Sequence, residues 1–149
     1  MIREGKKLPV DVLENLPKIT ELIAVDDSVV AFYSFGSLAR REELKPLSDL
    51  DFAVLLSNEL NRSQRFHKRI EIVILFNKIF RTDEIDLITL NDAPLRFSYN
   101  IIRDGKLLFC RDKRVLIDFY ERVVKIFLDF KFFRNEFEDN FLNKVGYHG

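Results

Sequence analysis

Two aspartates that stand two residues apart, Asp49 and Asp51, are the side chains in this 149-residue sequence whose type and spacing most suggest chemistry. They fall at the start of an apolar run over 50–56 that predicts a buried β-strand, so both carboxylates project from the same face. Carboxylates held this close repel each other unless a cation lies between them. Mg²⁺ suits that position, because it takes oxygen ligands and usually shares them with substrate phosphates.

A third carboxylate extends the pattern. Asp86 lies near the start of the run 84–90, which predicts another strand. If this strand pairs in register with 50–56, Asp86 joins the two aspartates, since neighbouring strands lie roughly 4.8 Å apart. Asp83 and Glu84 are adjacent and remain alternative candidates. The sequence therefore predicts a metal site made by Asp49, Asp51 and Asp86.

A Gly-Ser pair supplies the other half of a possible reaction site. Gly36 and Ser37 end the strand predicted over 29–36, and a short helix is expected over 37–44. Glycine allows a phosphate to approach the backbone closely, and the amides that open a helix favour anions. Arg40 could contact a phosphate or lie on a solvated helix face. A phosphate cradle opposite a metal clamp is suited to nucleotidyl or phosphoryl transfer.

This interpretation depends on the combination of the motifs and not on any one of them. With 13 Asp in the chain, one Asp-x-Asp is expected by chance about once, whereas a Gly-Ser pair is expected roughly 0.2 times. A solvated strand entrance after a Pro-Ser loop would explain the two aspartates alone. Gly-Ser at the end of one strand and Asp-x-Asp at the start of the next are much harder to obtain together by chance.

The helices and strands that must position these residues alternate along the sequence. Apolar spacing predicts helices over 9–24, 37–44, 62–80 and 112–143, and strands over 29–36, 50–56, 84–90 and 106–110. Another helix, capped by Asn91 or Asp92, is expected near Pro94. Pro17 leaves open whether the first helix is continuous. The order predicts a single α/β domain over 1–149 with helices packed against a small mixed sheet.

The predicted C-terminal helix is unusually apolar, with seven of the chain's 15 Phe between Phe119 and Phe141. A buried core helix is the simpler explanation. A helix that is apolar around so much of its circumference has more to bury than a small sheet can cover. We therefore expect one face to cover the domain and another to meet a partner protein or a second copy.

Composition narrows the possible classes of protein. Equal numbers of basic and acidic residues, 24 each, argue against a protein that coats nucleic acid. The segment 61–81 carries six Lys/Arg against one Glu, which indicates a solvated face or a contact with RNA or an acidic partner. One cysteine excludes an internal disulfide. Without a secretory signal or a membrane-spanning run, we expect a cytoplasmic protein.

The conjunction resembles the nucleotidyltransferase superfamily related to DNA polymerase β, whose pattern is Gly-Ser, about ten residues, Asp-x-Asp and a distal Asp. Within it, the segments GSLARR and SDLDFAVLL look most like the minimal nucleotidyltransferases (MNT), the antitoxins of HEPN-domain ribonuclease toxins. Two departures concern the loop. The spacer between Ser37 and Asp49 has 11 residues, and Arg41 stands where such proteins often have Gly.

The resemblance implies a role for each residue of the motif. Asp49 and Asp51 would bind Mg²⁺, two ions in all, and Asp86 would complete the metal site or act as general base. Gly36 and Ser37, and less strictly Arg40, would bind the phosphates of ATP.

The resemblance also implies a partner and a reaction, namely transfer of AMP from ATP to a tyrosine of a HEPN toxin. There are two alternatives to this reaction. The protein could neutralise its toxin by binding alone, or it could be an enzyme that modifies a small molecule.

Overall fold

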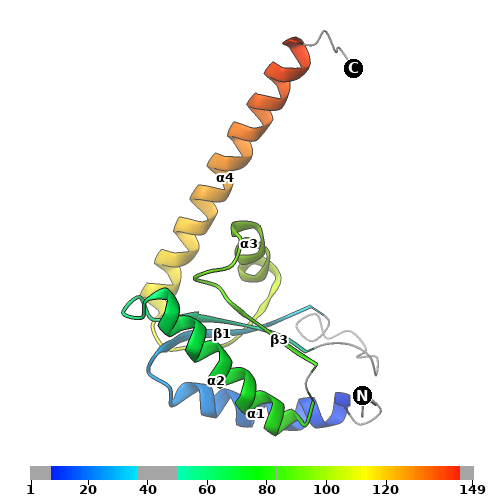
Figure 1. Cartoon of the computed structure of the whole chain (residues 1–149), viewed down its shortest axis with the longest axis vertical. Helices are drawn as coiled ribbons and strands as arrows, with labels where there is room; N and C mark the ends of the chain where they lie inside the picture. The colour runs from blue at the N-terminus through cyan, green and yellow to red at the C-terminus, as the bar shows by residue number, and fades with distance from the viewer. Residues whose placement is uncertain (1–7, 37–49, 83, 145–149) are drawn as a thin grey trace.

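The computed structural model describes residues 8–36, 50–82 and 84–144 (Figure 1). Four helices and four strands follow one another along these residues. They are α1 (Leu8–Ala24), β1 (Val29–Phe35), β2 (Leu50–Leu56), α2 (Arg62–Phe80), β3 (Ile85–Thr89), α3 (Leu95–Asp104), β4 (Lys106–Cys110) and α4 (Lys113–Lys144). The α/β class predicted from the sequence is confirmed. The helix expected over 37–44 lies outside the described residues.

The strands form one mixed sheet in the order β3-β2-β1-β4. β1 pairs antiparallel with both β2 and β4, whereas β2 and β3 run parallel, with α2 as the crossover between them. A parallel pair needs such a crossover, because a tight turn can join only antiparallel strands. In this strand order β3 forms one edge of the sheet. Because β2 and β3 are parallel and in register, their starts lie side by side.

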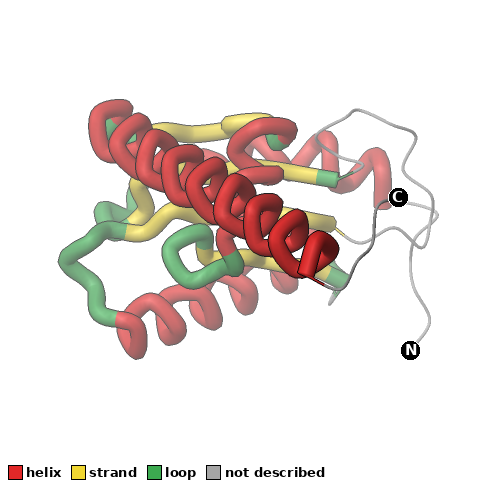
Figure 2. The backbone as a smooth tube through the Cα atoms, turned by 90° about the horizontal axis from the view of Figure 1, so that it is seen from above, coloured by secondary structure: helices red, strands yellow, loops and turns green. Residues whose placement is uncertain are grey.

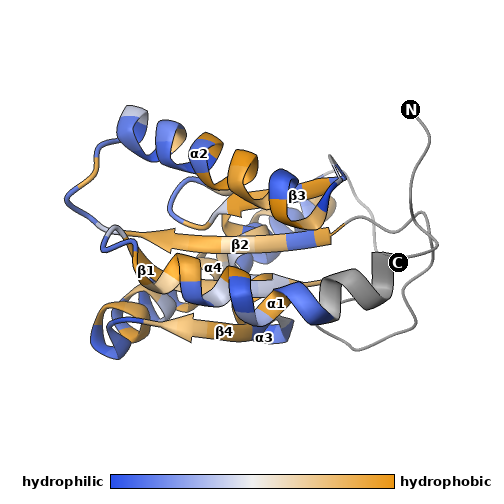
Figure 3. Ribbon diagram, turned by 90° about the horizontal axis from the view of Figure 1, so that it is seen from below, coloured by the Kyte–Doolittle hydropathy of each residue, from blue (hydrophilic) through white to orange (hydrophobic). Residues whose placement is uncertain are grey.

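α1 and α2 cover one face of the sheet, and Figure 3 shows them in front of predominantly hydrophobic strands. The core on this face contains an aromatic cluster of Phe32, Phe52, Phe76 and Phe80, whose neighbouring rings lie with centroids 5.3 to 6.1 Å apart. Stacked and edge-to-face aromatic pairs are favourable at such separations. This cluster fixes α2 against β1 and β2.

α3 and the first half of α4 cover the opposite face (Figures 1 and 2). Their core includes Tyr33, Leu55 and Ile101, against which Leu116 and Phe119 of α4 pack. The rings of Tyr99 and Phe127 stack with centroids 4.2 Å apart, which joins α3 to α4. Beyond that pair α4 leaves the domain.

Every described side chain of α4 from Leu128 to Lys144 is exposed. At 1.5 Å per residue this segment extends roughly 25 Å. Figure 1 shows it projecting away from the sheet. The fully buried alternative for the C-terminal helix is therefore wrong, because the sheet reaches only the first half of the helix.

Two sequence-based expectations concern the continuity of the first helix at Pro17 and the N-terminal cap of α3. α1 is continuous through Pro17, which lies on the exposed side of the helix. α3 begins after Pro94 without a side-chain cap, so the predicted cap by Asn91 or Asp92 is wrong. Both candidate side chains are engaged elsewhere: Asn91 bonds to the backbone of Leu56, and Asp92 bonds to Arg65.

Within the described residues, no helix combines the length and the apolar character needed to cross a membrane.

Candidate functional site

Asp51 and Asp86 are brought together at the start of the two parallel strands. β2 and β3 pair with Asp51 directly opposite Asp86. Directly paired residues of neighbouring strands project from the same face, roughly 4.8 Å apart along the hydrogen-bonding direction. The condition on which the sequence-based prediction for Asp86 depended, in-register pairing of the two strands, is therefore met.

The face on which they lie follows from the residues beside them. Leu50 and Phe52 are fully buried on the face covered by α1 and α2. Because successive side chains of a strand alternate, Asp51 points to the opposite face, towards the side of α3 and α4. Figure 3 shows the hydrophilic segment where β2 begins, in an otherwise hydrophobic strand. Asp51 is half-buried there, while Asp86 at the sheet edge is exposed.

Gly36 completes a row across three strands. It follows Phe35, which pairs with Asp51, and its φ of 70° is in the left-handed region. A Cβ at this position would lie 2.5 Å from Oδ2 of Asp51, so only glycine allows the backbone to pass this close to the carboxylate. Gly36 follows the end of β1, and Asp51 and Asp86 lie near the starts of β2 and β3. The three residues are thus side by side at one end of the sheet.

The remaining predicted site residues, Ser37, Arg40 and Asp49, lie outside the described residues. Asp51 and Asp86 provide the oxygen donors that a hard divalent cation prefers. Among the residues that the structure describes, no group of three His, Cys, Asp or Glu is close enough to hold a metal ion. The described part of the site thus fits Mg²⁺ in its donor atoms and supplies two of the three predicted ligands.

A cleft of about 410 Å³, which the sequence-based reasoning missed, opens beside Asp86. It follows the outer edge of β3 and is walled by Arg62, Phe66 and Arg69 of α2 and by Phe97 of α3. No motif marks these residues, because they are drawn from two helices that only the fold brings to one strand edge. We call this the β3-edge cleft.

The basic residues of α2 have specific partners within the domain. Arg65 holds Asp92 with two hydrogen bonds, of 2.8 and 2.6 Å, and Lys68 pairs with Asp26 and Glu71 at 3.1 and 3.0 Å. The hydrogen bonds from Arg65 lower the pKa of Asp92 below its ordinary value. Much of the predicted basic face is therefore used to connect α2 to the rest of the domain.

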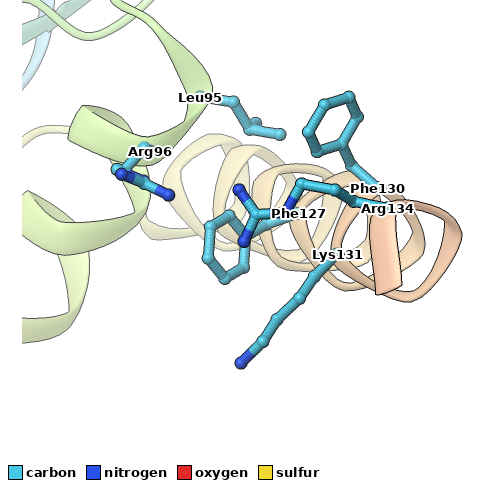
Figure 4. A pocket seen from close by; sticks show the side chains of 6 residues that line it. All are labelled: Leu95, Arg96, Phe127, Phe130, Lys131 and Arg134. Carbon is cyan, nitrogen blue, oxygen red and sulfur yellow. The ribbon is translucent and has the colours of Figure 1, made fainter. Parts of the chain in front are cut away.

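A second pocket lies where α4 leaves the domain. Its volume is about 380 Å³, and it is lined by Leu95 and Arg96 of α3 and by Phe127, Phe130, Lys131 and Arg134 of α4. Figure 4 shows Leu95 and Phe130 close to each other at this site, with the guanidinium group of Arg134 beside Phe127 and the ammonium group of Lys131 pointing away from the apolar side chains. An apolar floor with a cationic rim suits a protein segment that is both apolar and acidic.

With this geometry established, the chain can be compared with known proteins. Several solved structures share its fold at a low sequence identity, among them the following three. A mutant of the toxin–antitoxin MntA-HpeT matches with a TM-score of 0.64 and 22% identity, over 86% of this chain and 98% of the other. A toxin–antitoxin with AMP-PNP gives 0.60 and 18%, over 93% and 98%.

The third structure is a complex from Shewanella oneidensis between a tri-AMPylated HEPN toxin and an MNT antitoxin. It matches with a TM-score of 0.56 and 17% identity, over 91% of this chain and 98% of the other. No curated protein sequence is significantly similar to this chain.

The family comparison covers the site itself. Residues 17–114 match the family described as "Polymerase beta, Nucleotidyltransferase", a range that contains Gly36, Asp51 and Asp86 and all four strands. The solved structures of similar fold include MNT antitoxins of HEPN toxin–antitoxin pairs. The matched range covers most of the chain and contains Gly36, Asp51 and Asp86, so the chain belongs to the polymerase beta nucleotidyltransferase family.

Proposed function

We propose that this protein is the antitoxin of a HEPN toxin–antitoxin pair and transfers AMP from ATP to a tyrosine of the toxin. The observation that carries the proposal is the pairing of Asp51 with Asp86 beside Gly36, because it places carboxylates next to a close-approach backbone position. The similar structures that contain AMP-PNP and a tri-AMPylated HEPN toxin support the choice of nucleotide and acceptor.

Each residue of the row has a role in this reaction. Gly36, with Ser37 and Arg40, would bind the phosphates of ATP. Asp51 and Asp86, together with Asp49, would hold Mg²⁺, which when bound supplies positive charge against the phosphates. The phenol oxygen of the tyrosine forms a bond to the α-phosphorus, the bond from that phosphorus to pyrophosphate breaks, and the Asp86 carboxylate takes up the phenol proton.

The exposed half of α4 would provide the surface that binds the toxin. Phe130, Phe133, Phe137 and Phe141 are 55 to 67% exposed. At 100° per residue they fall within roughly 80° of the helix circumference, so they form one continuous apolar strip. Rows of exposed aromatic side chains of this kind usually mark protein–protein contacts. The cationic rim of the neighbouring pocket would favour an acidic segment of the toxin. The similar solved structures include a complex of a HEPN toxin with an MNT antitoxin, which supports a toxin as the partner.

The test compares enzyme activity with binding. Wild-type protein, an Asp51→Asn/Asp86→Asn variant and an Asp118→Asn control would each be incubated with labelled ATP, Mg²⁺ and a candidate HEPN protein. Asp118 is exposed on α4, so its variant controls for the loss of an exposed carboxylate elsewhere on the protein. We expect AMP adducts on a toxin tyrosine with the wild type and the control only.

Complex formation would be measured in parallel, and the expected result is equal binding of the toxin by all three proteins. A stable complex in which the wild type transfers no AMP would contradict the enzyme proposal and favour an antitoxin that acts by binding alone. Transfer that survives in the Asp51→Asn/Asp86→Asn variant would contradict the assignment of the site.

A further inference from the structure

We infer that the β3-edge cleft receives the acceptor tyrosine of the partner protein, with Phe66 and Phe97 as its positioning residues. The inference rests on the proposed AMP transfer and specifies where its second substrate binds. Asp86 is one of the residues that line the cleft, so the cleft extends to a carboxylate of the proposed reaction centre.

The order of the strands determines the direction from which the acceptor arrives. Gly36 follows β1, Asp51 lies on β2 and Asp86 on β3, and these three strands are consecutive neighbours in the sheet. In an in-line displacement the attacking oxygen and the leaving group stand on opposite sides of the phosphorus. With the phosphates of ATP held at Gly36, the leaving pyrophosphate lies on the β1 side. The acceptor must then approach over β3, where the cleft opens.

The chemistry of the cleft walls fits a phenol ring. Phe66 on α2 is 56% exposed and Phe97 on α3 is 55% exposed, and both line the cleft. Exposed aromatic rings on two walls suit the insertion of a third ring, since aromatic pairs are attractive in offset-stacked and edge-to-face arrangements. Arg62 and Arg69 add positive charge along the α2 wall, which complements the phosphate that the acceptor meets.

The cleft is suited to a side chain more than to an added β-strand. A guanidinium nitrogen of Arg69 donates a 3.0 Å hydrogen bond to the carbonyl oxygen of Leu87. Leu87 lies on the edge strand β3, so the arginine occupies a backbone acceptor that an incoming strand would use. The volume, about 410 Å³, falls within the range usual for small-molecule sites.

Steady-state kinetics of AMP transfer to a HEPN protein would test the inference. The variants are Phe66→Ala and Phe97→Ala. Ile74→Ala is the matched control, because Ile74 is a half-exposed apolar residue of α2 that does not line the cleft. Loss of one aromatic contact should raise the KM for the HEPN protein by about five-fold or more, and the KM for ATP should stay within about two-fold of the wild type.

The outcomes separate this inference from the function on which it rests. Both phenylalanines are more than half exposed, so the variants should unfold at the temperature of the wild type. If the variants instead raise the KM for ATP, the cleft holds the adenine ring and the inference is overturned. If the wild type transfers AMP but both variants behave like Ile74→Ala, the inference fails while the proposed function stands. A wild type that transfers nothing removes the basis of both.

A cross-linking experiment provides a readout that does not depend on turnover. The acceptor tyrosine of the HEPN protein would be replaced by a photoreactive benzophenone amino acid, and the complex irradiated. We expect cross-links to peptides of α2 or α3 that contain Phe66 or Phe97. Cross-links confined to β4 or to the exposed half of α4 would contradict the inference.

Discussion

The backbone of Gly36 lies against the carboxylate of Asp51, so close that a Cβ at position 36 would stand 2.5 Å from Oδ2. This contact joins the two halves of the proposed site: the turn that would hold phosphates and the strand that would hold the metal ion. The antiparallel pairing of Phe35 with Asp51 creates it, because Gly36 is the next residue along the chain.

Replacement of Gly36 by alanine should therefore abolish most of the AMP transfer. The new methyl group would displace the Asp51 carboxylate, and the φ of 70° would be strained for a residue with a side chain. We expect a loss of at least about ten-fold in kcat/KM and roughly 1 to 2 kcal/mol of stability. Transfer kinetics and denaturant unfolding would measure the two effects.

A double-mutant cycle separates the clash from the backbone strain. In an Asp51→Ala background the carboxylate is absent, so Gly36→Ala should lower the free energy of unfolding by the strain alone. The two substitutions should then be non-additive, as is usual for residues in contact. Additive effects would show that the proximity of Gly36 to Asp51 has no energetic consequence.

Truncation of a buried core phenylalanine and truncation of an exposed one on α4 should have very different effects on stability. Phe52 is fully buried and stacks on Phe32 and Phe80, so Phe52→Ala should lower the free energy of unfolding by about 3 to 5 kcal/mol. Phe137→Ala, on the exposed half of α4, should change it by less than about 0.5 kcal/mol. Urea denaturation measures both, and a large loss with Phe137→Ala would mean that the strip is covered within the protein itself.

The aromatic strip of α4 should determine the affinity for the toxin. Phe133→Ser/Phe137→Ser should weaken the complex by about ten-fold or more, because exposed aromatic residues usually dominate the energy of an interface. Asp139→Ser is the control, since at 100° per residue position 139 lies on the opposite side of the helix. Calorimetry would measure the affinities. Equal binding by the variant and the control would place the toxin on another surface.

Asn91 should contribute to stability through the backbone of β2. Its side chain accepts a hydrogen bond from the amide of Leu56 and donates another to the Leu56 carbonyl, each at 2.9 Å. Asn91→Ala leaves both backbone groups without these partners and should cost about 1 to 3 kcal/mol. Asn100→Ala, an exposed change on α3, should be nearly neutral. Comparable unfolding curves for the two variants would contradict the structure here.

The pair of Arg65 and Asp92 should make stability depend on pH in the acid range. The hydrogen bonds from Arg65 place the pKa of Asp92 below its ordinary value of 3.8, so the native state favours the charged carboxylate. The resulting stabilisation is fully present above that ordinary value and is lost as the pH falls through the lowered pKa.

An Asp92→Asn variant should accordingly be less stable than the wild type at neutral pH. The difference should shrink as the pH falls below 3.8 and passes through the lowered pKa of Asp92, because the carboxylate then becomes protonated in the wild type. Urea unfolding at several pH values would measure it, with the exposed Asp118→Asn as control. A difference that stays constant with pH would mean that the charge of Asp92 is not what stabilises the protein.

The sequence by itself determined the four strands and the four helices that the structure describes, and two of the residues that meet at the site. Continuous apolar runs indicate buried strands, and the helical spacing of the apolar residues over 62–80 indicates α2. Asp51 and Asp86 could be expected to meet on the condition that their strands pair in register, because each is near the start of its strand. The parallel pairing of β2 and β3 meets that condition. Family resemblance supplied their expected roles.

Only the tertiary structure decided what lies around that pair. The β3-edge cleft joins Phe66 of α2 to Phe97 of α3, and no spacing in the chain relates these residues, since their proximity depends on how both helices pack beside β3. The cap expected for α3 failed for the same reason, because Asn91 and Asp92 bond to distant partners more favourably than to their own helix. The sheet likewise covers only the first half of α4, and a local pattern of apolar residues holds no information on where that cover ends.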